Sequence, residues 1–265
     1  RRAASLHFGA PMVTSWKRDQ KSVGFSSIDN VNDIATRGPV TPDHTLQTKR
    51  IAAILDESPA EGVDRFAAEY LDYFDRNDNG ELTCLDPAPR YAVWKGRGVL
   101  VFGANIKRYG VVSDIVEHTI RAVQWGEALG GWKTLSEAEI FELEYWELEQ
   151  AKLKLAPARN EYDGKVVAVT GAASGIGKAC VEVFASKGAA IIALDINPDI
   201  STLFENPGIT GIACDITSEE SIQSAVEQGI AAFGGLDILV SNAGSFPPSM
   251  TVEDMDSDLL EKTMQ

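Results

Sequence analysis

The chain has 265 residues, of which 39 are acidic and 24 are basic, so its formal charge is −15. A surface this acidic repels phosphate backbones and argues against a nucleic-acid partner. The chain is 44% hydrophobic, which is enough for a buried core. No run reaches the roughly 18 to 20 apolar residues of a membrane span. We therefore expect a folded protein with neither nucleic-acid nor membrane partners.

The three cysteines do not suggest disulfides or a zinc site. Cys84, Cys180 and Cys214 are odd in number, widely spaced and without a Cys-x-x-Cys pair. No long apolar stretch follows Arg1, so no signal peptide is visible. These features favour a reducing, cytoplasmic location.

Both ends of the chain are expected to be cut. The sequence begins with Arg1 rather than Met. At the other end, Thr251-Val-Glu-Asp254 gives a capping-box start to an amphipathic helix over 251–265, and no stop signal follows.

The length fits one large domain or two small ones, at roughly 100 to 200 residues per domain. The charge distribution favours two, because residues 163–265 carry a net charge of −11 and residues 1–162 a net charge of −4. A long helix is expected to end near 155, where a proline and then a glycine precede a strand. We predict domains over 1–158 and 159–265.

The N-terminal domain is expected to mix helices and strands. A proline-punctuated loop is expected over residues 38–50, a helix over 58–76, and a hairpin or two short strands over 91–102. Two longer helices are expected over 106–129 and 136–155. The last helix is opened by Ser136, with Glu139 three residues later as a capping box.

Residues 75–86 fit part of a calcium-binding loop. Oxygen ligands at positions 1, 3 and 5, a glycine at 6 and an acid at 12 match the EF-hand template. However, Asp86 is one carbon shorter than the usual glutamate, and Pro87 and Pro89 prevent the exit helix. We favour a surface turn and leave the role of this segment open.

The three histidines are isolated in the sequence. His7, His44 and His118 show no His-x-His spacing and no cysteine partners, so no metal site is predicted. His118 is expected in a helix, as a packing or surface residue. His44 lies in a loop with Asp43 and two prolines, and it is the better functional candidate, without an assigned role.

The C-terminal domain alternates strands and helices. Four apolar strands are predicted over residues 165–170, 189–194, 209–214 and 236–241. A helix ending near 187 follows the first strand, and a helix capped by Thr217, with Glu220 three residues on, follows the third. Strands that are apolar on both faces and separated by helices indicate a parallel sheet. We therefore expect an α/β fold with a Rossmann-like, doubly wound parallel sheet.

A glycine loop, Gly171-Ala-Ala-Ser-Gly175-Ile-Gly177, joins the first of these strands to its helix. Such a turn brings backbone N–H groups close to a pyrophosphate, because glycine has no Cβ. Asp195 ends the next strand, where a carboxylate can bind the hydroxyls of an adenosine ribose. This order of strand, loop, helix and acid favours a dinucleotide site over a purely structural turn.

The cofactor is predicted to be NAD rather than NADP, because Asp195 would repel a 2′-phosphate. No arginine or lysine occurs at the neighbouring positions that could attract one, namely Ala172, Ala173, Ser174, Ile196 and Asn197.

Four motifs resemble the short-chain dehydrogenase/reductase family. They are the Gly-x-x-x-Gly-x-Gly spacing after Thr170, Asp195 at the end of the second strand, Asp215-Ile216 after the third and Asn242-Ala-Gly244 after the fourth. Ser241 stands where many members have asparagine. The resemblance implies that Asp215 meets the adenine and that the Asn-Ala-Gly turn shapes the sugar and nicotinamide side. The candidate cofactor-binding residues are Gly171, Ala173, Ser174, Gly175, Ile176, Gly177, Asp195, Ile196, Cys214, Asp215, Ile216, Asn242, Ala243 and Gly244.

Catalytic residues are not predicted. The family uses a serine and a Tyr-x-x-x-Lys pair that follow the Asn-Ala-Gly strand and the next helix. All six tyrosines of this chain precede the glycine loop. The resemblance therefore implies cofactor binding, without dehydrogenase activity in this chain alone.

Several motifs precede the glycine loop: Thr41-Pro-Asp-His44, Thr48-Lys-Arg50, Asp86-Pro-Ala-Pro-Arg90, Ser113-Asp-Ile-Val-Glu-His-Thr-Ile120, Glu127-Ala-Leu-Gly-Gly131, Leu135-Ser-Glu137 and Glu144-Tyr-Trp-Glu-Leu-Glu149. Together with the C-terminal motifs they resemble bifunctional class II aldolase/short-chain dehydrogenase proteins, of the type that joins rhamnulose-1-phosphate aldolase to an alcohol or lactaldehyde dehydrogenase. No residue matches the zinc-binding His-x-His of such aldolases, so no metal ligand is carried over.

This resemblance implies hydride transfer between NAD and a small alcohol or aldehyde, which could be sugar-derived, in a homo-oligomeric full-length protein. The alternative is a non-catalytic NAD-binding or scaffold protein. The strand over 236–241 would also leave an apolar edge without a neighbour, which is an association hazard. We expect marginal stability or self-association of this chain.

Overall fold

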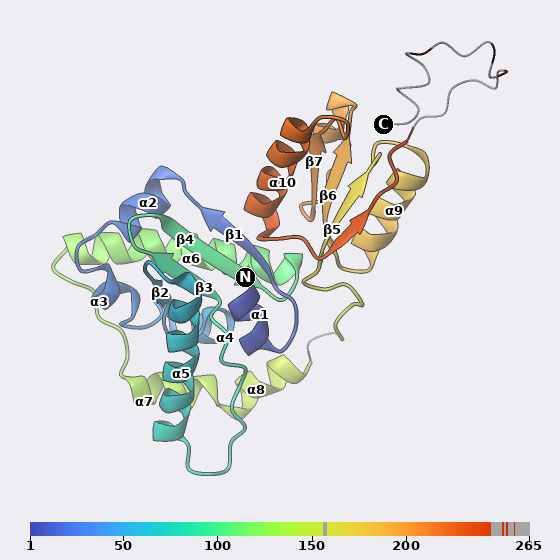
Figure 1. The fold of residues 1–265 in the computed structure, drawn as a ribbon. Helices are drawn as coiled ribbons and strands as arrows, with labels where there is room; N and C mark the ends of the chain where they lie inside the picture. The colour runs from blue at the N-terminus through green and yellow to red at the C-terminus, as the bar shows by residue number, and fades with distance from the viewer. Residues whose placement is uncertain (156–157, 245–250, 252, 254–256, 258–265) are drawn as a thin grey trace.

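A computed structural model of the chain contains two α/β units, each built on its own four-stranded sheet (Figure 1). The structure describes all residues except 156–157, 245–250, 252, 254–256 and 258–265. The helix expected over 251–265 therefore lies almost entirely outside the described residues.

The first unit contains a mixed sheet of order β1-β4-β3-β2. β4 is antiparallel to β1 and to β3, whereas β2 runs parallel to β3. The strands are β1 (Val13–Lys17), β2 (Ala53–Leu55), β3 (Tyr91–Trp94) and β4 (Gly98–Gly103). The hairpin predicted over 91–102 is thus confirmed.

Helices cover both faces of this sheet. They are α1 (Arg2–Phe8), α2 (Gln20–Ser26), α3 (Val31–Ala35), the short η1 (Pro42–His44), α4 (Thr45–Thr48), α5 (Pro59–Asn77), α6 (Ile106–Ala128), α7 (Glu137–Glu144) and α8 (Glu147–Lys154). Side chains alternate across a strand. Val99 and Val101 accordingly share a core with α6, while Phe102 shares another with α5. Figure 1 shows these two helices on opposite sides of the sheet.

The prediction of a single helix over 136–155 is wrong, because the helix is interrupted between α7 and α8. Ser136 and Glu139 do form the predicted capping box. The break occurs at Trp146, whose extended backbone (φ −61°, ψ 136°) starts α8. It allows Tyr145 to enter the core of the first unit, where its hydroxyl lies 3.0 Å from that of Tyr70. Tertiary packing overrides the local helical pattern here.

The second unit is an all-parallel sheet of order β7-β6-β5-β8. Its elements are β5 (Val166–Thr170), α9 (Gly175–Ser186), β6 (Ala190–Asp195), the short η2 (Pro198–Thr202), β7 (Ile209–Ala213), α10 (Glu219–Phe233) and β8 (Ile238–Val240). Val167 and Val169 pack with α9, and Val166 and Ala168 with α10. The two helices therefore lie on opposite faces, as Figure 1 shows, and the predicted doubly wound, Rossmann-like sheet is confirmed.

The cap of α10 differs from the prediction by one residue. Thr217 does not cap the helix, because its backbone N–H and its hydroxyl both donate to Asp215 Oδ1, at 2.9 and 2.8 Å. Ser218 is the N-cap, and its hydroxyl accepts the N–H of Ser221. These two hydrogen bonds to Asp215 hold Thr217 outside the helix, so that Thr217 does not act as the N-cap.

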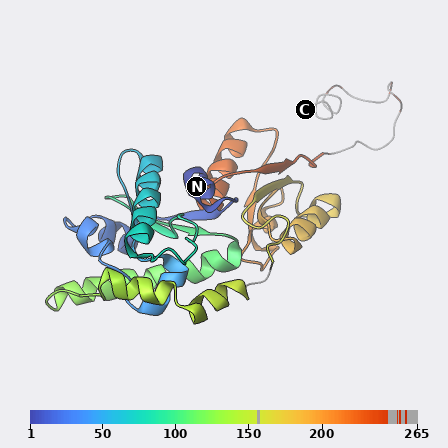
Figure 2. The ribbon, with the colours of Figure 1, turned by 90° about the horizontal axis from the view of Figure 1, so that it is seen from below.

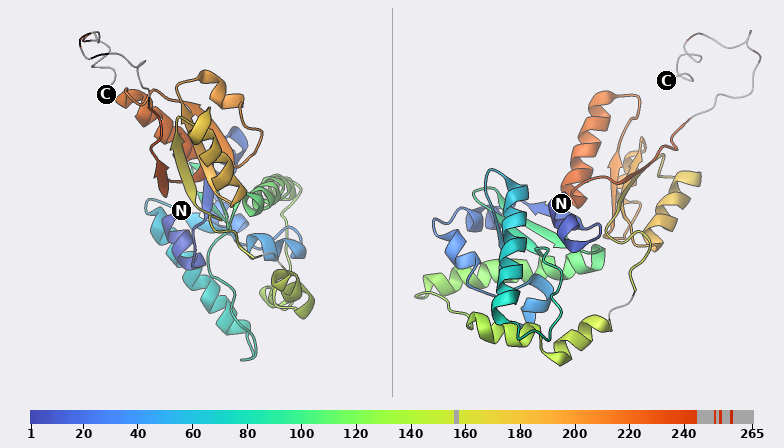
Figure 3. Two further views of the ribbon diagram at one scale, coloured as in Figure 1. Left: turned by 90° about the vertical axis from the view of Figure 1, so that its right-hand side faces the viewer. Right: turned by 60° about the horizontal axis from the view of Figure 1, so that its bottom comes forward.

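The two units touch along β1 and α10. Val13 of β1 and Ile106 of α6 pack into the same core as Phe233. Arg1 forms an ion pair with Asp237, whose carboxylate also accepts the N–H of Val166 at 2.8 Å. Figures 2 and 3 show α10 beside the N-terminal end of the chain from further directions. The first unit therefore helps to cover one face of the parallel sheet.

β8 pairs with β5 on one side, and among the described residues no strand pairs with its other side. Leu239 on this strand is 60% exposed and Leu236 just before it is 41% exposed. The unpaired apolar edge anticipated from the sequence is therefore present. Within the described part of the chain, no helix is both long and apolar enough to cross a membrane.

A pair of glycines tests the contact between the units. Gly9 and Gly234 both end helices with nearly the same left-handed backbone, at φ 77° and 82°. A Cβ at Gly9 would meet open space, whereas one at Gly234 would overlap Thr14 of β1. We expect Gly9→Ala to cost about 1 kcal/mol of unfolding free energy, and Gly234→Ala about 2 kcal/mol more, in denaturant titrations. Equal losses would mean that the units do not touch here in solution.

Candidate functional site

The candidate site lies at the carboxyl edge of the parallel sheet. Parallel strands end at the same edge, and ligands of such sheets bind in the crevice beyond it. The loops after β5, β6, β7 and β8 all begin there. The structure therefore brings the four predicted motifs, which span 171–244, to one edge.

The glycine loop begins where β5 ends. Gly171 has a φ of 66°, and a Cβ there would come within 2.9 Å of Asn242 Nδ2. A Cβ at Gly177 would overlap the carbonyl oxygen of Gly171, so this glycine allows α9 to pack closely against the loop. Both positions require glycine for steric reasons within the chain itself.

The middle glycine is different, because nothing in the chain occupies the space beside it. Gly175 has a φ of 52°, and a Cβ there would meet no atom within 4 Å. It begins α9, whose first N–H groups have no partner within the helix. Ser174, the N-cap, makes no side-chain cap hydrogen bond, and the side chain of Ile176 is 75% exposed. The start of α9 is thus an open, positively polarised surface for an anion.

Asp195 ends β6 and turns toward the glycine loop. Its Oδ2 accepts the N–H of Ala173 at 2.8 Å, and its Oδ1 accepts the N–H of Asn197 at 3.0 Å. These bonds fix the carboxylate while leaving lone pairs for further donors. Ile196 beside it is 71% exposed. The acid therefore lies at the rim of the site, next to the start of α9.

The loop after β7 places a second acid near this edge. Cys214 is buried, and its N–H donates to the carbonyl of Asp195 at 2.8 Å. The pKa of Asp215 is lowered by the hydrogen bonds from the N–H and the hydroxyl of Thr217. Ile216 next to it is 41% exposed. The carboxylate of Asp215 is thus ionised and held by its own loop.

The Asn-Ala-Gly turn after β8 is tied to the end of β5. The hydroxyl of Thr170 accepts the N–H groups of Asn242 and Ala243, at 2.9 and 3.0 Å. In return Asn242 Nδ2 donates to the carbonyl of Thr170 at 3.0 Å. Gly244 lies exposed just beyond this clamp. Thr170 was not among the predicted site residues, because its role depends on a partner 72 residues away.

The chain contains one Tyr-x-x-x-Lys spacing, at Tyr91 and Lys95, but the structure places it away from this site. Tyr91 is buried in β3 of the first sheet, and burial raises its pKa. Lys95 is exposed in the turn after that strand. The two side chains therefore do not form a proton-transfer pair at the carboxyl edge of the parallel sheet.

The candidate metal residues are dispersed. Across the described residues, no three His, Cys, Asp or Glu side chains lie close enough to hold a metal ion. His7 contacts Asp64 at 2.7 Å, and the carboxylate of Asp86 accepts hydrogen bonds from Arg90. His44 Nδ1 is buried without a hydrogen-bond partner. The three cysteines are free thiols.

Two family models match the chain in succession. Residues 1–153, more than half of the chain, match the family described as aldolase class II, second domain. Residues 165–265 match the short chain dehydrogenase family.

Individual relatives agree with this division. An uncharacterized oxidoreductase, YuxG of Bacillus subtilis, is 34% identical over 253 residues, covering 88% of this chain and 37% of that protein. A D-threitol dehydrogenase of Mycolicibacterium smegmatis is 40% identical over 107 residues, covering 37% of this chain and 41% of that protein. The chain thus spans well under half the length of these relatives.

Among solved structures, a 3-ketoacyl-(acyl-carrier-protein) reductase from Brucella melitensis, complexed with NADH, is 30% identical with a TM-score of 0.37. The match covers 38% of this chain and 43% of that one. On the evidence of the two family models, the chain belongs to the class II aldolase second-domain family over residues 1–153, and it continues as a short chain dehydrogenase domain from residue 165.

Proposed function

We propose that the second unit binds NAD and serves as the cofactor domain of a dehydrogenase acting on a small alcohol or aldehyde. The observation that carries this proposal is the pairing of a fixed carboxylate with an open glycine turn. Asp195 Oδ2 is held 2.8 Å from Ala173 N, beside the free N-terminus of α9. An acid for ribose hydroxyls and a backbone anion site for pyrophosphate are the two groups that the ADP-ribose half of the cofactor requires.

The pyrophosphate is assigned to the space beside Gly175. At Gly171 and Gly177 other atoms of the chain leave no room for a Cβ, whereas at Gly175 no atom of the chain occupies that space. Ala173, Ser174 and Ile176 complete the turn. The positive φ of 52° favours glycine at this position, and the open space beside it lets a ligand approach the backbone closely.

The adenosine is assigned to the loops after β6 and β7. Asp195 binds the ribose hydroxyls, while Ile196, Cys214, Asp215 and Ile216 border the adenine. An ionised Asp195 repels a 2′-phosphate, so NAD is favoured over NADP. Asn242, Ala243 and Gly244 line the side toward the second sugar and the nicotinamide.

The nicotinamide, when bound, supplies the site that accepts or donates a hydride. The residues of this chain bind and orient the cofactor, and no catalytic residue is assigned among them. Asn242 keeps its amide on Thr170, so its role is to shape the turn. The substrate is a small alcohol or aldehyde, which could be derived from a sugar.

A non-catalytic NAD-binding or scaffold protein is the second candidate. The complete protein distinguishes the two candidates: NADH formation from NAD with a panel of small alcohols supports the dehydrogenase. NAD binding without any turnover supports the scaffold.

We also propose that the two domains divide near residues 158 and 159, between the two family matches. The family resemblance supports a homo-oligomeric full-length protein, and the open edge of β8 supports self-association of this chain. The free thiols fit a cytoplasmic location.

Two glycine variants separate folding from cofactor binding. Gly177→Ala places a methyl group on the carbonyl of Gly171, so it should lower the unfolding free energy by about 3 kcal/mol. Gly175→Ala meets no chain atom and should cost about 1 kcal/mol through its backbone conformation alone. Gly175→Ala should nevertheless weaken NAD binding more than about tenfold, measured by calorimetry on folded protein. Unchanged affinity in this variant would remove the pyrophosphate from this turn.

The selectivity for NAD is tested at Asp195. Asp195→Ala removes the ribose acceptor and should weaken NAD binding by about 2 kcal/mol, roughly thirtyfold in Kd, while narrowing the difference between NAD and NADP. Asp199→Ala is the matched control, because it removes an exposed acid four residues later. Selectivity unchanged at Asp195, or equally changed at Asp199, would contradict the assigned role.

A further inference from the structure

The first unit contains a buried lysine that the cofactor site does not involve. Lys49 follows α4 and is only 4% exposed. It is also the one non-glycine residue with a positive φ, 64°, among the described residues. A side chain held in such a conformation is costly, and these conformations cluster at functional positions.

The ammonium of Lys49 has no carboxylate partner. Its Nζ lies 3.9 Å above the centre of the Tyr70 ring. Across the described residues it makes no hydrogen bond, and no acid lies within 4.0 Å to form an ion pair. A lysine buried for structural reasons is normally paired, because an unpaired charge in the interior is strongly unfavourable.

Several titratable groups surround this amine from different elements. They are Arg90 before β3, Asp86 and Cys84 in the preceding loop, and Glu144 at the end of α7. Burial, and to a smaller extent the charge of Arg90, lowers the pKa of Lys49 to about 8, against the opposing effect of Asp86 and Glu144. About a tenth to a fifth of the amine is therefore neutral, and hence nucleophilic, between pH 7 and physiological pH, far more than for an ordinary lysine.

A chain of hydroxyl groups links Tyr70 to a buried acid. The hydroxyls of Tyr70 and Tyr73 donate to the two oxygens of Glu144, at 2.8 and 3.1 Å. The hydroxyl of Tyr145 lies 3.0 Å from that of Tyr70 and accepts the N–H of Leu85. Glu144 is fully buried, and burial raises its pKa. The ring that lies under the amine is thus hydrogen-bonded, through its hydroxyl, to a buried carboxyl group.

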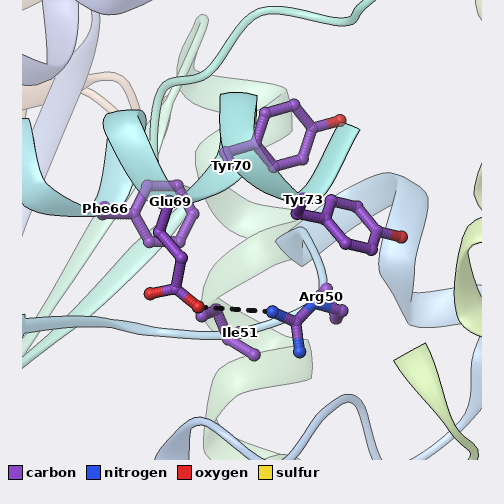
Figure 4. Close-up of a pocket in the computed structure, with 6 residues that line it drawn as sticks. All are labelled: Arg50, Ile51, Phe66, Glu69, Tyr70 and Tyr73. Carbon is purple, nitrogen blue, oxygen red and sulfur yellow. Dashed lines mark hydrogen bonds and ion pairs between the residues drawn. The ribbon is translucent and has the colours of Figure 1, made fainter. Parts of the chain in front are cut away.

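Tyr70 also borders a small cavity, drawn in Figure 4 with Arg50, Phe66, Glu69 and Tyr73 among its lining residues. Its volume is about 10 Å³, the space of one water molecule. Arg50 closes it through ion pairs to Glu69 and Glu137, at 3.3 and 3.4 Å. Ion pairs to acids that reach the solvent contribute little stability, so the side chain of Arg50 is the part of the cavity lining that is most easily displaced.

We propose that Lys49 is a carbonyl-reactive amine that forms an imine with a small aldehyde. The neutral Nζ attacks the carbonyl carbon, the π electrons of the C=O bond move to oxygen, and one of the two Nζ protons is transferred to that oxygen. The hydroxyl of the resulting carbinolamine then leaves as water together with the remaining N–H proton, giving the C=N bond. One aldehyde enters, one water leaves, and no oxidant or reductant is consumed. Tyr70 and Glu144 are positioning residues that relay the protons.

The direct test traps the imine in the unmodified chain. The protein is incubated briefly with glycolaldehyde and cyanoborohydride over a range of pH, and the modified lysines are identified by peptide mass spectrometry. Lys95, exposed in the β3–β4 turn, is the internal reference. We expect modification of Lys49 to reach half its maximum near pH 8, whereas an ordinary lysine titrates near about 10.4. An unmodified Lys49, or a pH profile identical to that of Lys95, overturns the proposal.

A matched pair of variants tests the proton relay. Tyr70→Phe keeps the ring under Lys49 but removes the hydroxyl that donates to Glu144. Tyr73→Phe removes the other hydrogen bond to Glu144 and leaves that of Tyr70 intact. In folded protein, verified by circular dichroism, we expect Tyr70→Phe to slow trapping at Lys49 at least about tenfold and Tyr73→Phe to slow it less than about threefold. Equal effects of the two variants refute the relay.

Discussion

The clamp between Thr170 and Asn242 is the interaction on which the candidate site depends most. It joins the ends of β5 and β8 through three hydrogen bonds, two of them accepted by a single hydroxyl. Gly171 and the Asn-Ala-Gly turn are thereby held so close that a Cβ at Gly171 or Gly177 would crowd the Asn242 amide. Because the loop from Gly171 is held in this way, the position at which α9 begins is fixed as well. The space beside Gly175 remains open because the chain around it is fixed from both sides.

The parallel sheet that carries the clamp is not supported by its own unit alone. Val13 and Ile106 from the first unit enter the core between the sheet and α10. A sheet of four strands with helices on both faces has little core to spare, so such external packing matters for its stability. The aldolase-related unit therefore contributes structurally to the domain that we propose binds NAD, whatever chemistry each unit performs.

The sequence predicted the second unit well because its signals are local. A run of apolar residues at 165–170, the glycine loop and Asp195 occur within about 30 residues, and each is determined by backbone sterics or by burial. The break at Trp146 was missed because no proline or glycine marks it. It results from Tyr145 packing into a core formed by distant residues.

The cluster around Lys49 could not be predicted from sequence for the same reason. Tyr70 and Glu144 lie 21 and 95 residues further along the chain from Lys49. Lys49 and Glu144 fall within motifs of the family resemblance, but nothing in those motifs pairs them with each other or with Tyr70. Thr170 was likewise overlooked, although it immediately precedes the glycine loop, because its hydroxyl acts on residues that only the sheet brings near. Contacts between units, such as that of Gly234 with Thr14, leave no periodic signal at all.

Binding of NAD at the carboxyl edge of the parallel sheet can be followed residue by residue in an NMR titration of the isotope-labelled chain with NADH, because every backbone amide reports on its own surroundings. We expect the largest shifts at the amides of Gly175, Ile176 and Gly177, with smaller shifts around Asp195 and none around the Lys49 cluster. An unchanged spectrum, or shifts confined to the first unit, would contradict binding at this edge.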